Sequence, residues 1–134
     1  MQGGFLSWRT LWAVVGWTIV IAIIWLSVSP NPPTIHIQDG DKYEHVVAYG
    51  VLMFWFCQLY SGWKGRTAYG LAWIALGIAL EFVQRALGYR IFDLFDMAAN
   101  AVGVLIGWGL ALLAGTQLLA KTEAALTARR RVGR

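Results

Sequence analysis

Four long apolar runs follow one another along the chain, separated by short segments that contain proline, glycine or charged residues. A run of roughly 20 apolar residues is long enough to cross the hydrocarbon core of a bilayer as an α-helix. The pattern therefore predicts an all-α fold: a polytopic membrane protein, built as a bundle of four transmembrane helices in a single membrane domain, residues 1–134. The expected helices cover residues 11–28, 41–60, 67–87 and 93–120, and a basic cytoplasmic tail follows at 121–134.

The segments between the runs indicate where the helices begin and end. Pro30, Pro32 and Pro33 cannot continue the first helix, because proline lacks the backbone N–H that a helix uses. Residues 41–44, Asp-Lys-Tyr-Glu, have the spacing of a capping box, which predicts that the second helix starts there. The first run resembles a signal peptide with a cleavage site at 27–29, but its apolar core exceeds the usual length of about 7–15 residues. A retained anchor is therefore favoured.

Composition supports a membrane location. Of the 134 residues, 58% are hydrophobic and 13% are charged, whereas soluble domains carry roughly 25% charged residues. The eight Trp residues agree, since Trp gathers at bilayer interfaces. The net charge of +4 comes largely from the arginine-rich tail, which is more typical of contact with anionic membrane lipid than with nucleic acid. We expect no nucleic-acid partner.

The basic residues predict which way the helices cross the membrane, because cytoplasmic segments are enriched in Lys and Arg. One side would carry Arg9, Lys64, Arg66, Lys121, Arg129, Arg130, Arg131 and Arg134, and the other only Lys42, Arg85 and Arg90. This asymmetry predicts a multi-pass protein with both termini in the cytoplasm. Most acidic residues then lie near the outer face: Asp39, Asp41, Glu44, Glu81, Asp93 and Asp96.

Polar residues at membrane depth are candidate functional residues, because an ionisable group there must be paired or hydrated. At about 1.5 Å per residue, His45 lies about 6 Å, Glu81 about 9 Å and Asn100 about 10 Å below the outer boundary. Three separate helices thus place polar side chains in one layer. The sequence therefore predicts that these three residues converge in the outer half of the bundle.

The polar residues also share helix faces. Their spacings of three and four put each set on one stripe: Asp41, His45 and Tyr49; Glu81, Gln84 and Arg85; Asp93, Asp96 and Asn100. The last stripe continues with Gly103 and Gly107, a spacing that lets another helix approach closely. Its polar end should therefore point into the bundle.

Structural roles compete with functional ones for several of these residues. Asp41 and Asp93 can cap the helices that follow them. Glu81 and Arg85 are spaced for an ion pair that would neutralise both. Tyr49 can be an interface anchor, and His45 a structural hydrogen-bond donor. Capping does not explain Glu81, Gln84 and Asn100, which lie at depth.

The ordered combination of these residues resembles the VanZ-like family over about residues 39–110. The matching positions are Asp41-Lys42-x-x-His45-x-x-x-Tyr49, then Glu81-x-x-Gln84, then Arg90-x-x-Asp93-x-x-Asp96-x-x-x-Asn100-x-x-Gly103. The resemblance implies a small polytopic membrane protein of the bacterial cell envelope, in a family whose founding member is associated with low-level resistance to the glycopeptide antibiotic teicoplanin. The segment after Gln84 departs from the family pattern, since Pro-Gly commonly precedes the arginine there.

Three functions remain open. In the first, Lys42, Arg85 and Arg90 bind an anionic lipid, such as a prenyl-phosphate-linked glycan, while His45 and Glu81 form an acid/base pair. In the second, the protein is a non-catalytic module that binds lipid, antibiotic or a partner protein. In the third, hard oxygen ligands from Asp41, Glu81 and Asp96, with Asn100, hold a divalent cation; no other cofactor is expected. The chain lacks HExxH, GxSxG and Walker motifs, which argues against zinc proteases, serine hydrolases and P-loop enzymes.

Overall fold

The computed structural model describes residues 8–34, 36–88, 90–115 and 118–132, and this part of the chain is helical apart from its connections. The helices are α1 (Trp8–Val28), α2 (Gly40–Leu59), α3 (Trp63–Leu87), α4 (Leu94–Ala114) and α5 (Leu118–Val132). The all-α prediction is confirmed. Three helices, α1, α3 and α4, are long and apolar enough to cross a membrane. The second helix is not among them, since its first turns carry charged residues.

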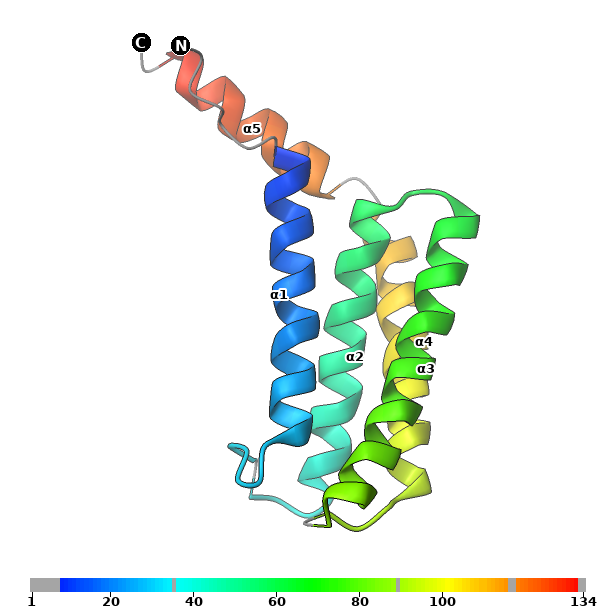
Figure 1. The fold of residues 1–134 in the computed structure, drawn as a ribbon. Helices are drawn as coiled ribbons and strands as arrows, with labels where there is room; N and C mark the ends of the chain where they lie inside the picture. The colour runs from blue at the N-terminus through cyan, green and yellow to red at the C-terminus, as the bar shows by residue number, and fades with distance from the viewer. Residues whose placement is uncertain (1–7, 35, 89, 116–117, 133–134) are drawn as a thin grey trace.

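The first four helices pack side by side, and each runs opposite to the one before it (Figure 1). One end of this bundle, here called the acidic end, contains the last turns of α1 and α3 together with the first turns of α2 and α4. The opposite end contains the start of α1, the α2–α3 turn and the end of α4, from which α5 projects away from the bundle (Figure 1). The start of α1 and the end of α4 therefore lie at the same end.

The closest pair in the bundle is α2 and α4, which pack together more extensively than any other two helices. Glycines allow this approach: a Cβ atom at Gly103 or Gly107 would collide with the backbone of Val46 or Gly50 on α2. The close contact brings the polar residues of the two helices within bonding distance at the acidic end. The predicted interface through Gly103 and Gly107 is thus present, with α2 as the partner.

Aromatic side chains fill the half of the bundle away from the acidic end. Phe56 of α2 is buried against Trp73 and Tyr69 of α3, with ring centroids 4.7 and 4.8 Å away. Trp17 of α1 meets the rings of Phe56 and Trp73 edge-on. Aromatic pairs of this kind combine a large buried area with favourable edge-to-face geometry. The buried carboxylates, Glu81 and Asp96, lie at the other end of the bundle.

Two helix boundaries differ from the sequence-based prediction. The helix expected to continue to residue 120 ends at Ala114, because Gly115 has φ 85° and ψ 143°, which breaks the helix. The side chain of Gln58 stabilises the break: its amide donates to Gly115 O at 3.2 Å, and its oxygen accepts from Leu118 N–H at 3.0 Å. Much of the expected tail is helix α5, while Thr116, Gln117 and Arg134 lie outside the described residues. The third helix begins at Trp63, a turn earlier than expected.

The predicted capping box at the start of α2 is absent. The helix begins at Gly40, and Asp39 precedes it in the left-handed conformation, with φ 55°, without a side-chain capping bond. Aspartate tolerates this conformation better than most residues. Because the helix starts before Asp41, that side chain is free to point toward α4. The cap predicted for Asp93 is confirmed, since its carboxylate accepts a hydrogen bond from Phe95 N–H.

Candidate functional site

A hydrogen bond between α2 and α4 forms the centre of the polar region. His45 Nδ1 donates to Asn100 Oδ1 over 2.9 Å, and Asn100 is buried. The other ring nitrogen, Nε2, lies 3.6 Å from Asp96 Oδ2. Both ring nitrogens of His45 therefore face α4. The expected convergence of His45 and Asn100 is present, and Asp96 joins them.

Asn100 is held in place from α3 by Gly77. A Cβ atom at Gly77 would lie 2.6 Å from Asn100 Nδ2 and 3.0 Å from its Cβ. Only glycine leaves room for the amide, because real Cβ atoms do not approach so closely. Gly77 is thus a supporting residue that the sequence-based prediction missed; its only signal is that it lies one turn before Glu81 on the same helix.

Glu81 is 2% exposed and faces the start of α4. Its Oε1 accepts a hydrogen bond from Asp93 N–H at 2.7 Å. Neither cation proposed for it is its partner in the described part of the chain: His45 binds Asn100, and the guanidinium of Arg85 lies 5.5 Å from the Phe92 ring centroid. The Glu81–Arg85 ion pair is therefore not formed. Glu81 instead anchors the α3–α4 connection.

Gln84 connects α3 to α1. It is buried, and its amide Nε2 donates to Ser27 O at 2.9 Å, at the end of α1. This bond holds the last turn of α1 against the bundle just before the proline-rich connection begins. Gln84 thus holds α1, whereas His45 bonds to Asn100 of α4.

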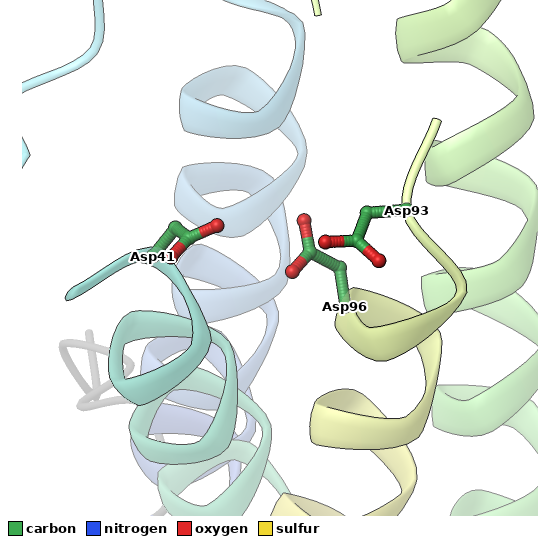
Figure 2. A group of neighbouring side chains, drawn as sticks. All are labelled: Asp41, Asp93 and Asp96. Carbon is green, nitrogen blue, oxygen red and sulfur yellow. The ribbon is translucent and has the colours of Figure 1, made fainter. Parts of the chain in front are cut away.

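Three carboxylates meet between the first turns of α2 and α4 (Figure 2). Asp41, Asp93 and Asp96 each offer an oxygen within 4.8 Å of the other two. The ammonium of Lys42 lies 3.3, 3.2 and 3.7 Å from them, in the same order. Lys42 is therefore paired with three carboxylates. This differs from the sequence-based expectation, in which the charge of Lys42 held an anionic ligand.

The group of carboxylates differs from the metal-ligand set expected from the sequence, in which Glu81 joined Asp41 and Asp96. Glu81 is held by the backbone of Asp93, so the Asp93 side chain takes its place. The pKa of the Asp93 carboxyl is lowered, chiefly because Phe95 N–H donates to it and also because Lys42 lies beside it. Asp93 is therefore a stable anion at neutral pH.

A pocket of about 170 Å³ opens beside this polar region. The last turns of α1 and the proline-rich connection form one wall, with Ile23, Leu26, Ser27, Pro32 and Pro33. Residues of α2 form the other wall, with Glu44, His45, Ala48 and Tyr49, and Arg90 of the α3–α4 connection completes it. The pocket is thus mainly apolar on one side and polar on the other. The sequence did not predict the apolar wall, because no local pattern distinguishes these apolar residues from others in the same helix.

The structure separates the predicted site residues into three groups. His45, Asn100, Asp41, Lys42, Asp93 and Asp96 form one connected cluster between α2 and α4. Tyr49 and Arg90 line the pocket with His45. Glu81, Gln84 and Arg85 are directed to the α3–α4 connection, to α1 and to Phe92. His45 belongs to both the cluster and the pocket, and so connects them.

Comparison with known proteins shows the family of the chain. The family model of VanZ/LLP1 matches residues 5–115, which include α1 to α4 and every residue of the cluster and pocket. The chain belongs to the VanZ/LLP1 family. It is similar to an uncharacterized protein of the yeast Schizosaccharomyces pombe, with 33% identity over 84 residues, covering 60% of this chain and 49% of that protein. The chain thus spans about half the length of this relative. No solved structure was found that matches the chain.

Proposed function

We propose that this VanZ-like protein binds the head group of an anionic membrane lipid in the pocket between α1, α2 and Arg90. The lipid class that fits best is a prenyl phosphate that carries a glycan. The observation that carries the proposal is Arg90, a half-buried cation that lines an apolar-walled pocket. Among the described residues, no carboxylate lies within ion-pair distance of it.

The two walls of the pocket suit the two parts of such a lipid. Arg90 can donate two parallel hydrogen bonds to a phosphate, as guanidinium groups commonly do. Ile23, Leu26 and the prolines offer apolar contact to the first part of a prenyl chain. Glu44 lies on the polar wall and can accept hydrogen bonds from sugar hydroxyls. The volume is below the roughly 300 Å³ of sites for whole drug-sized ligands, so the pocket holds a head group while the chain extends into the bilayer.

The polar cluster gives the pocket its shape in this proposal. His45 directs both ring nitrogens at α4, toward Asn100 and Asp96, and Glu81 accepts from a backbone N–H. These contacts favour positioning roles for His45 and Glu81 over the acid/base pair suggested by the sequence. The protein would therefore act by binding or presenting the lipid.

The location follows from the same proposal. We take α2 as a fourth membrane span beside α1, α3 and α4, with the acidic end toward the outside of the bacterial inner membrane. The lipid would then be held near the outer leaflet, where glycans are transferred to the envelope. Occupying that lipid would alter susceptibility to glycopeptides such as teicoplanin.

The test is a binding measurement on the purified full-length protein in a neutral detergent. Native mass spectrometry would compare a long-chain prenyl phosphate with the uncharged prenol of the same length. We expect the phosphate to bind more tightly and Arg90→Gln to weaken it by about 10–100-fold, since a hydrogen-bonded charge contributes about 1.5–3 kcal/mol.

Arg85→Gln is the matched control. Arg85 lies near the same connection but is stacked on Phe92 and does not line the pocket, so its replacement should leave the affinity unchanged. Equal binding of phosphate and prenol, or an Arg90→Gln protein that binds like wild type, would refute the proposal. Bound lipids that copurify and carry no phosphate would have the same consequence.

A further inference from the structure

We propose that Asp41, Asp93 and Asp96 form a binding site for a divalent cation, with Ca²⁺ as the best-fitting ion, and that the ammonium of Lys42 occupies its place when the ion is absent. The three carboxylates belong to the first turn of α2, the residue before α4 and the first turn of α4 (Figure 2). The site is distinct from the lipid pocket, because none of these four residues lines that pocket.

The buried carboxylate of Asp96 indicates that the cluster lacks a ligand. Asp96 is 8% exposed, and its Oδ1 is buried without a hydrogen-bond donor. The nearest cation, Lys42 Nζ, is 3.7 Å away, beyond hydrogen-bond distance. Buried carboxylate oxygens normally have a donor or a metal ion, because an unpaired one is costly. Figure 2 shows this carboxylate directed toward those of Asp41 and Asp93.

Charge leads to the same conclusion. The three carboxylates carry about −3, and Lys42 supplies only +1, so roughly −2 is left uncompensated when all three are ionised. His45 adds a positive charge only when it is protonated, at 3.6 Å from Asp96. A divalent cation would neutralise the remainder in one step. It would also replace the long Lys42 contacts with direct metal–oxygen bonds.

The spacing of the oxygens selects among hard divalent ions. One oxygen from each carboxylate lies within 4.8 Å of the others. Ca²⁺ binds oxygen at about 2.3–2.6 Å, so two of its ligands are at most about 5.2 Å apart, whereas Mg²⁺ at about 2.0–2.1 Å requires at most about 4.2 Å. The upper limit of 4.8 Å lies within the span that Ca²⁺ bridges. Mg²⁺ would fit only if every pair of these oxygens lay within about 4.2 Å.

The ammonium group of Lys42 can move away from the three carboxylates. Its side chain is 32% exposed, so the ammonium can move into water when an ion enters. The lysine and the ion therefore compete for the same carboxylates. This competition gives an effect that a purely structural lysine would not produce: removing Lys42 should strengthen Ca²⁺ binding.

The experiment uses the full-length protein in a neutral detergent, after treatment with a chelator, with Ca²⁺ added alone. Isothermal titration and the unfolding temperature would report binding. We expect saturable Ca²⁺ binding, about tenfold or more tighter in Lys42→Gln, because a competing charge is removed. Asp41→Asn should weaken binding about tenfold or more; its side chain is 49% exposed, so the fold should tolerate the change. Asp96→Asn should abolish it.

Asp39→Asn is the control, since Asp39 is exposed and outside the cluster, and it should bind Ca²⁺ like wild type. Absence of Ca²⁺-dependent stabilisation in both wild type and Lys42→Gln would overturn the proposal and leave Lys42 as the permanent partner of the acids. Binding that Asp41→Asn does not weaken would also overturn it. No lipid is present in these measurements, so their outcome is independent of the lipid-binding proposal.

Discussion

The imidazole of His45 and the side-chain amide of Asn100 share a 2.9 Å hydrogen bond, although 55 positions separate them in the chain. The bond joins α2 to α4 at the level where the polar cluster meets the pocket. It depends on two close approaches, of α4 to α2 through Gly103 and of α3 to Asn100 through Gly77. Both approaches can be tested by adding a side chain at the glycine.

Gly77→Ala should displace Asn100 and break its bond to His45. The added Cβ would lie 2.6 Å from Asn100 Nδ2, and overpacking of this kind costs about 1–3 kcal/mol. The unfolding temperature and prenyl-phosphate binding should both fall. Gly109→Ala is the control, because nothing lies within 4 Å of its Cβ position. Equal stability of the two variants would show that Gly77 does not support the polar layer.

Gly103→Leu should separate α2 from α4 and destabilise the protein more than any substitution on the outer face of α4. A Cβ atom at this position already meets the backbone of Val46, and a backbone cannot move aside like a flexible side chain. Leu112→Ala is the comparison, since the Leu112 residue is 53% exposed on the outside of the bundle. Thermal unfolding in detergent would measure both. Similar losses would contradict the close α2–α4 packing.

Lowering the pH should destabilise the start of α4, because the Asp93 carboxylate becomes protonated. Its folded-state pKa is lowered by Phe95 N–H and Lys42, so its ionised form stabilises the fold above the unfolded-state pKa of about 3.9. That contribution is lost as the pH falls through the lower, folded-state value. Asp93→Asn keeps a capping oxygen but cannot titrate. The unfolding temperature of this variant should therefore fall less than that of wild type between pH 5 and pH 2. An equal fall in both proteins would contradict a stabilising role for the ionised Asp93 carboxylate.

Both termini should lie on the cytoplasmic side, because the start of α1 and the end of α4 share one end of the bundle and the basic residues gather there. Cysteines introduced as Asn31→Cys and, separately, as Gly133→Cys in a Cys57→Ser background would report this. An impermeant thiol reagent added to intact cells should label only the first. Labelling of both positions to the same extent would be incompatible with four spans.

Hydrophobic length and the 3.6-residue period are local properties of the chain, so the sequence predicts the helices of the bundle and their stripes of polar residues. It also carried the ordered motif from Asp41 to Gly103 that marks the family. It overestimated the length of the fourth helix, since the break at Gly115 is stabilised by Gln58, 57 residues away. The period of a helix says which side chains share a face, but not which neighbour that face meets.

The partners at the site were decided by the tertiary structure. Depth along each helix placed His45, Glu81 and Asn100 in one layer, yet it could not show that His45 binds Asn100 while Glu81 binds the backbone of Asp93. Those choices depend on how each helix is rotated, and the rotation follows from glycine contacts between backbones. The same packing brought Asp93 in place of Glu81 beside Asp41 and Asp96, and it closed the pocket with apolar residues of α1 that no local pattern distinguishes.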